Sequence, residues 1–169
     1  EKIVKVKEWP TPESVGDVRS FLGLANYYKR FIQGFSSIAL PLTEMTGKNK
    51  TFRWDERCET SFERLKEALT TAPVLSYPSS NPGDTFVLDT DASNFGIGAV
   101  LSQVQDGTER VIAYASKGLK KSERNYCTTF RELFAVVEFI THFKHFLLGR
   151  KFLVRTDHSS LRWLLNFKD

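Results

Sequence analysis

The apolar residues of this chain change their spacing once, at a proline-containing stretch near the middle. Before it they recur every three or four positions, the period of an amphipathic helix, and after it they gather in short strand-like runs bounded by turn residues. Pro73, Pro78 and Pro82 interrupt the chain where the pattern changes. This order predicts a small helical segment followed by an α/β domain.

Residues 1–45 are predicted to form the helical segment. Thr11 and Pro12 are suited to open a helix, because threonine caps helices and proline tolerates the first helical position. Gly34 is suited to end that helix, and residues 36–45 are predicted to form a second, short one. The apolar positions of the first helix are Val15, Val18, Phe21, Leu22, Ala25, Tyr28 and Ile32.

Residues 46–82 are predicted to be a connector or linker. Residues 47–50 are typical of a turn, and Trp54 and Asp55 are expected to open a helix. The apolar positions of that helix are Phe62, Leu65 and Leu69.

Residues 83–169 are predicted to form the α/β domain, beginning with three antiparallel strands. Asp106 and Gly107 form a strong hairpin-turn signal between the second and third strands. The expected strands are residues 85–89, 98–103 and 110–114.

A long helix over residues 128–148, stopped by Gly149, is expected to follow. Leu133, Val136, Val137, Ile140 and Phe143 are predicted to lie on one apolar face of this helix. A fourth strand over 152–156 should then return to the sheet parallel to a neighbour by a right-handed crossover, and Ser159 is expected to open a final short helix.

Bulk composition excludes few functions. With 41% apolar and 26% charged residues the chain is an ordinary globular one, without an apolar run long enough to span a membrane and without a secretory signal at its N-terminus. It does not begin with Met, so we expect an excised piece or a processed product. The net charge of +4 is compatible with a polyanionic partner. Cys58 and Cys127 lack metal-ligand spacing and are expected to be free, buried thiols.

Three carboxylates stand where a metal site could form. Asp91 is expected just after the first strand, Glu132 in the first turns of the long helix, and Asp157 at the end of the fourth strand. Acidic groups brought together repel one another, and a hard divalent cation relieves that repulsion. From spacing alone, each could equally be a solvated carboxylate or a helix cap.

Local motifs are more specific. The first part of the chain contains the run VRSFLGLANYYKRFI at residues 18–32, then PLT at 41, FRW at 52 and APVL at 72. The second part contains, in order, VLDTDAS at 87, GIGAVLSQ at 96, AYASK at 113, REL at 131 and TDH at 156. Nearly the whole chain thus resembles the thumb, connector and ribonuclease H region of gypsy-type LTR retrotransposon reverse transcriptases. The resemblance implies a ribonuclease H-like fold.

The resemblance also implies an activity: divalent-metal-dependent hydrolysis of the RNA strand of RNA–DNA hybrids. Asp91, Glu132 and Asp157 would bind the metal, expected to be two Mg²⁺ or Mn²⁺ ions. Asp89 shares a strand face with Asp91 and is the nearby rival ligand, the alternative being an exposed strand carboxylate. His158 is expected to be a structural, hydrogen-bonding histidine.

The thumb-like helix is expected to grip the primer–template. Arg19, Gly23 and Tyr27 are spaced as one helical stripe, with Asn26 beside it. Glycine is costly inside a helix unless something approaches the backbone closely; that could be nucleic acid or another helix.

Two further places are candidates for nucleic-acid contact in the ribonuclease H-like part. Ser93 could touch the substrate backbone or simply shape the turn after the first strand. A basic cluster before the long helix suits the phosphates of a hybrid, and could also be a solubilising charge run. Its members are Lys117, Lys120, Lys121 and Arg124, whereas Glu138 further along is expected to face solvent.

The family normally continues with a fifth strand and a helix that carries a fourth metal-binding Asp, and Asp169 lies too soon after Asp157 to be that residue. We therefore expect the fold to lack its C-terminal strand and helix, and dimerisation through the open sheet edge is a further expectation. The polymerase fingers and palm would lie elsewhere in the polyprotein, and the family implies action in cytoplasmic particles. The competing interpretation is a non-catalytic connection or scaffold module that binds nucleic acid or a partner chain.

Overall fold

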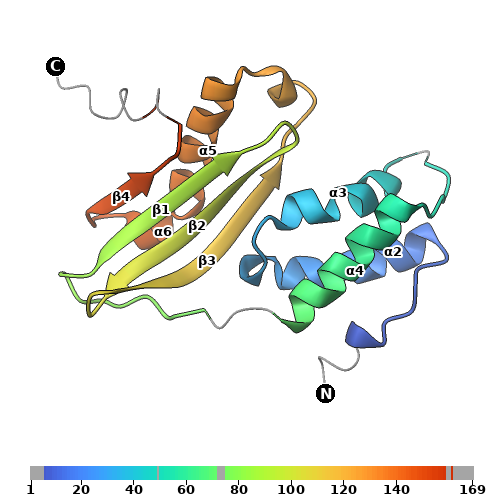
Figure 1. Ribbon diagram of the computed structural model, residues 1–169, viewed down its shortest axis with the longest axis horizontal. Helices are drawn as coiled ribbons and strands as arrows, with labels where there is room; N and C mark the ends of the chain where they lie inside the picture. Colours follow the sequence, from blue (N-terminus) through green and yellow to red (C-terminus); the bar gives the residue numbers. More distant parts are fainter. Residues whose placement is uncertain (1–5, 49, 72–74, 159–160, 162–169) are drawn as a thin grey trace.

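The computed structural model describes residues 6–48, 50–71, 75–158 and 161. A group of helices built from the first part of the chain lies beside one edge of a four-stranded sheet, and α5 and α6 lie against a face of that sheet (Figure 1). The predicted order, helical segment first and α/β domain second, is confirmed. Within the described part of the chain, every helix is too short or too polar to cross a lipid bilayer.

The helical segment contains α2 (Val15–Tyr27), the 3-10 helix η1 (Lys29–Phe31), α3 (Phe35–Met45) and α4 (Glu56–Thr70). These helices share one hydrophobic core, in which the rings of Phe21 and Phe62 lie 4.6 Å apart. Helix α4, which the sequence places in the connector, contributes to this core through Cys58, Phe62 and Leu65.

The ends of the first helix differ from the expected ones. Helix α2 begins at Val15 rather than at Thr11–Pro12, because Ser14 caps it by accepting a hydrogen bond from the Asp17 backbone N–H at 3.2 Å. It ends at Tyr27. Gly34, expected to end it, instead precedes α3 with φ at 66°, a conformation that favours glycine.

The sheet is mixed, as predicted. Strands β1 (Thr85–Ala92), β2 (Gly96–Gln105) and β3 (Thr108–Gly118) are antiparallel, and β4 (Phe152–Arg155) pairs in parallel with β1, giving the order β3-β2-β1-β4. The hairpin between β2 and β3 turns at Asp106 and Gly107, both with positive φ.

Strand β1 is longer than expected, which changes the place of Asp91. The sequence ends this strand at Asp89, because a Thr-Asp-Ala-Ser run is typical of a turn. In the structure the strand continues to Ala92, so Asp91 lies inside it, opposite Gly98 of β2.

The long helix is interrupted. Helix α5 (Thr128–His142) ends six residues before residue 148, the expected end of the helix. The short helix α6 (Lys144–Leu147) follows before Gly149 turns the chain with φ at 73°. The apolar pattern runs on through Phe143, which is why the sequence does not reveal the break. Val137 is exposed rather than buried, and the side chains that pack against the sheet include Ala135, Phe139 and Phe143.

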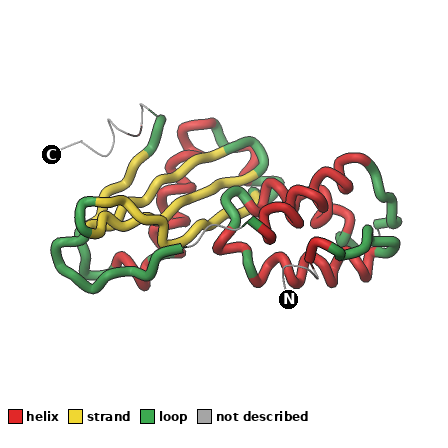
Figure 2. Tube along the Cα trace, turned by 60° about the horizontal axis from the view of Figure 1, so that its bottom comes forward, coloured by secondary structure: helices red, strands yellow, loops and turns green. Residues whose placement is uncertain are grey.

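The helical segment is attached to the edge strand β3. Helix α3 and η1 both contact β3, and Figure 2 shows the group of helices alongside the sheet. The Ser36 backbone N–H donates to Ser116 Oγ at 2.9 Å, and Ser116 Oγ donates to Ser36 Oγ at 3.1 Å. The sheet therefore has α5 against one face and the helical segment at its β3 edge. The final helix expected from Ser159 lies outside the described residues.

Candidate active site

Three carboxylates come from three different elements. Asp91 is on β1, Glu132 is the fifth residue of α5, and Asp157 lies two residues beyond the end of β4. Strands β1 and β4 are parallel neighbours in which Asp89 is the partner of Arg155. Asp91 lies two residues after Asp89, and Asp157 lies two residues after Arg155. Because the two strands are parallel, the topology brings both acids to the same end of the sheet.

Glu132 is buried, at 4% exposure, whereas Asp91 and Asp157 are exposed. Burial raises the pKa of Glu132, and the negative charges of Asp91 and Asp157 raise it further. His158 and a hydrogen bond with the Ala92 backbone act on that pKa in the opposite direction. The three acids are therefore close enough to interact electrostatically.

The arrangement fits a divalent cation at Glu132. Its Oε2 atom is buried and has no hydrogen-bond partner among the described residues, which suits a ligand oxygen. In the described part of the chain, no three His, Cys, Asp or Glu side chains are already gathered as a metal site. Asp91 and Asp157 both raise the pKa of Glu132 through their negative charges, and a bound cation would relieve that repulsion.

Helix packing explains why Glu132 is buried. Ala135, Val136 and Phe139 follow it at three, four and seven positions, so all four lie on the stripe of α5 that is buried. Cys127, the residue before α5, is exposed, and the expectation that it is buried is wrong because it lies outside this stripe. Both described cysteines are free, as predicted.

Asp89, the rival ligand, is engaged by another residue. Its two carboxylate oxygens accept hydrogen bonds from Arg155 at 2.6 Å each. Asp89 and Asp91 both line a pocket of about 230 Å³ that also includes Gln33 of the helical segment. Arg155 did not emerge from the sequence as a functional residue, because only the register of β4 against β1 shows that it meets Asp89.

His158 is hydrogen-bonded, as predicted for a structural histidine. Its Nε2 lies 2.9 Å from Thr129 Oγ1 of α5, and its backbone N–H donates to Thr156 Oγ1 at 3.2 Å. These contacts join the segment after β4 to the first turn of α5, next to Glu132.

The turn between β1 and β2 is organised by Ser93. Its Oγ accepts hydrogen bonds from the backbone N–H groups of Phe95 and Gly96. Arg131, the residue before Glu132, donates to the Ser93 carbonyl at 3.2 Å and to the Asn94 side chain. Ser93 therefore has the turn-shaping role that the sequence offered as one alternative, and a substrate contact remains a prediction.

Comparison with known protein families identifies the family of this chain. Residues 54–154 match the family described as "RNase H-like domain found in reverse transcriptase". The chain belongs to this family. The match spans α4, the whole of β1 to β3, and nearly all of β4, so it includes Asp91 and Glu132 and ends just before Asp157.

The relatives of this RNase H-like chain are retroelement polyproteins. It is 39% identical over 99% of its length to the retrovirus-related Pol polyprotein from transposon 297, and 41% identical over 95% to that from transposon gypsy, both of Drosophila melanogaster. It spans only 15% and 16% of those polyproteins. The predicted membership in gypsy-type LTR retrotransposon reverse transcriptases is confirmed.

Solved structures support the fold. The foamy viral protease-reverse transcriptase in complex with dsDNA superposes with a TM-score of 0.78 at 21% identity, covering 99% of this chain and 35% of that one. The same enzyme in complex with an RNA/DNA hybrid gives 0.76 at 22% identity, covering 96% and 22%. The expected ribonuclease H-like architecture with a preceding helical segment is confirmed.

The predicted grip stripe of this retroelement chain is exposed on α2. Tyr27 is 78% exposed, Gly23 and Asn26 are also exposed, and Arg19 donates to the Thr46 carbonyl at 3.1 Å. A Cβ atom built on Gly23 would meet nothing within 4 Å. The alternative explanation of Gly23, close packing of a second helix, therefore finds no support among the described residues.

The lysines of the basic cluster in the RNase H-like domain differ in whether their charge is already paired. Lys117 forms an ion pair with Glu138 at 2.9 Å and lies over the ring of Phe134. Glu138 is consequently half-buried and paired, so the expectation that it faces solvent is wrong. Lys121 is exposed. Of these two lysines, Lys121 has the freer charge for a phosphate.

Proposed function

We propose that this chain is the nuclease part of an LTR retrotransposon reverse transcriptase and hydrolyses the RNA strand of RNA–DNA hybrids with the help of divalent metal ions. The observation that carries this proposal is the environment of Glu132: a buried carboxylate with an unpartnered oxygen and a raised pKa, facing the charges of Asp91 and Asp157. A structural role alone would not favour burying a carboxylate that has one oxygen without a hydrogen-bond partner.

In this proposal Asp91, Glu132 and Asp157 hold Mg²⁺ or Mn²⁺. When bound, a pair of such ions activates water and stabilises the leaving oxygen of a phosphodiester. The protein orients its ligands: α5 fixes Glu132 against the sheet, and the Thr129–His158 contact links α5 to the residue after Asp157. Acidic ligands that repel one another without metal gain the most from a cation.

The exposed stripe of α2 would hold the duplex. Arg19, Asn26 and Tyr27 offer polar and aromatic side chains on both sides of Gly23, where a nucleic-acid backbone could approach the helix closely. The foamy viral relatives of known structure were solved with dsDNA and with an RNA/DNA hybrid, and we extend that partner class to this chain. The rest of the reverse transcriptase polyprotein would supply polymerisation.

The test is cleavage of an end-labelled RNA–DNA hybrid by the full chain in Mg²⁺ or Mn²⁺, with D91N as the inactive variant and D84N as the matched control. Asp84 precedes β1 and is not among the three acids. We expect D91N to lose at least about 100-fold in rate, since changing even a residue that only supports a metal ligand costs about 10–100-fold. Cleavage that persists in D91N, or that needs no metal, would refute the proposal.

The second candidate is a non-catalytic scaffold that binds nucleic acid. The observation in its favour is that no three metal-binding side chains are gathered among the described residues. Tight binding of the hybrid, with no cleavage in either metal, would select the scaffold over the nuclease.

A further inference from the structure

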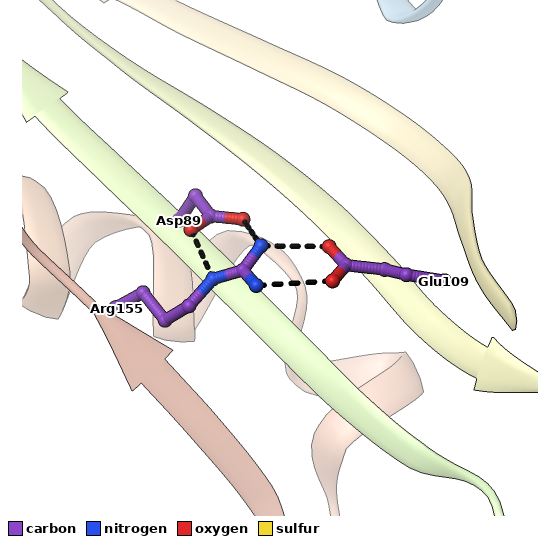
Figure 3. Close-up of polar contacts among 3 residues, drawn as sticks. All are labelled: Asp89, Glu109 and Arg155. Carbon is purple, nitrogen blue, oxygen red and sulfur yellow. Dashed lines mark hydrogen bonds and ion pairs between the residues drawn. The ribbon is translucent and has the colours of Figure 1, made fainter. Parts of the chain in front are cut away.

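One arginine is held by two carboxylates on the sheet (Figure 3). Arg155 donates from Nε to Asp89 Oδ1 and from Nη2 to Asp89 Oδ2, both at 2.6 Å. It also donates from Nη1 to Glu109 Oε2 at 3.0 Å and from Nη2 to Glu109 Oε1 at 2.7 Å. Both contacts are two-pronged, a geometry that arginine can form and lysine cannot. We call Arg155, Asp89 and Glu109 the Arg155 clamp.

The Arg155 clamp joins strands that are not all neighbours. Arg155 is the last residue of β4, Asp89 lies on β1, and Glu109 is the second residue of β3. Because the order is β3-β2-β1-β4, these side chains tie together both edge strands of the sheet. Strand β4 has only four residues and pairs with β1 alone among the described strands, so the clamp adds side-chain contacts to a short strand pairing.

The end that the clamp fixes leads directly to Asp157. Asp89 is the partner of Arg155 in the parallel register, and Asp91 and Asp157 each follow two residues later. Asp91 and Asp157 carry the same charge, so bringing them close together at this end is electrostatically unfavourable. The guanidinium occupies both oxygens of Asp89, which lies two residues before Asp91 on β1. Its side chain is 46% exposed, so solvent screens the charges and the effect lies in geometry more than in global stability.

We propose that Arg155 is a positioning residue: through the Arg155 clamp it keeps the end of β4 in place so that Asp157 stays near Asp91, and it keeps Asp89 out of the metal-binding set. What the acids do once positioned rests on the proposed function. The positioning itself is a property of the metal-free chain.

Hydrogen–deuterium exchange of the full chain without metal tests the positioning. R155A is compared with K151A, which removes the same charge from an exposed residue just before β4. We expect the amides of Phe152–Arg155 to lose about tenfold in protection in R155A, a local opening that leaves the α5 amides unchanged. Equal protection of β4 in R155A and K151A would overturn the proposal.

Metal binding tests the consequence for the acids. Mn²⁺ is titrated into the labelled chain, and paramagnetic broadening of the residue 91 and 132 amide signals gives an apparent Kd. We expect that Kd to rise about tenfold in R155A, the lower end of the effect of partners that orient metal ligands, while the KM for the hybrid stays within about twofold of the parent. An unchanged Kd in R155A would also overturn the proposal.

Two further variants separate geometry from charge and guard against misfolding. R155K keeps the charge but loses the two-pronged contact, so both effects should persist in part; parent-like behaviour in R155K would contradict the clamp. E109Q weakens the clamp far from the acids and should shift β4 protection in the same direction even if R155A does not fold. A parent chain that binds no Mn²⁺ and cuts no hybrid would refute the proposed function, whereas the exchange experiment would still decide the positioning.

Discussion

Among the single side chains, Glu132 is the most informative. A buried carboxylate with an unpartnered oxygen is unfavourable, and neighbouring acids add to the cost, as its raised pKa shows. Such a group destabilises the metal-free protein, which gives it a measurable signature independent of activity.

The pH dependence of stability should reveal Glu132. Because its pKa is raised above the ordinary 4.5, the folded state holds the proton more tightly than the unfolded state. Stability from this group is therefore complete below the unfolded-state pKa and is lost as the pH rises through the folded-state pKa. We expect E132Q, in EDTA, to be more stable than the parent near neutral pH by about 1 kcal/mol.

Urea unfolding across a pH series measures this effect, with E67Q on the exposed side of α4 as the control. The advantage of E132Q should shrink toward acidic pH, where the parent carboxyl is protonated. An advantage that is independent of pH would contradict the assignment.

Replacing Gly23 should change stability and nucleic-acid binding in opposite directions. Since a Cβ atom meets nothing within 4 Å there, G23A should stabilise the free chain by about 0.5–1 kcal/mol. The added methyl should nonetheless weaken binding of an RNA–DNA hybrid, measured by fluorescence anisotropy. G16A, near the start of the same helix, is the control for stability without loss of binding. Unchanged hybrid binding in G23A would argue against nucleic-acid binding at the Gly23 stripe of α2.

At the element scale, the type of each element followed from the sequence better than its limits did. Short strand-like runs and the Asp106–Gly107 turn predicted β2 and β3. The predicted first strand ends at Asp89, whereas β1 continues to Ala92 and includes Asp91. The break after α5 was missed because the apolar pattern continues through Phe143. Helix α4 was assigned to a connector because only tertiary packing shows that Phe62 meets Phe21.

Because the helical segment and the sheet have separate hydrophobic cores, we expect a core mutation to destabilise mainly the part that contains it. Phe62 is fully buried in the helical core, so F62A should destabilise that core by about 3–5 kcal/mol. Hydrogen exchange should show loss of protection in α2, α3 and α4, with β1 and β2 much less affected, because the sheet has its own core. E67A is the control. Equal loss throughout both cores would show that they unfold as one unit.

At the scale of the whole molecule, the candidate site was predicted from family motifs rather than from the spacing of its acids. Asp91, Glu132 and Asp157 are far apart in sequence, and many acidic triplets would look as plausible. The link from Arg155 to Asp89 and Glu109 had no motif at all, since it depends on strand register and on a contact across the sheet.

The distribution of charge gives a prediction on this scale. Each lysine that neutralises a phosphate should lower the dependence of log K on log salt by about 1 when removed. We expect K121A to show this reduction in hybrid binding and K117A a smaller one, because Lys117 is paired with Glu138. Equal slopes for the two variants would contradict the division of the basic cluster.

The Ser36–Ser116 contact between the helical segment and β3 has a consequence for where a substrate would be cut. If α2 holds a duplex and the acids act on it, the fold fixes the separation between the held position and the scissile bond. The RNA fragments would then have a fixed length, set by the distance between the part of the duplex bound at α2 and the bond cut at the acids. Loosening the join, for instance with S116A, should broaden that length distribution.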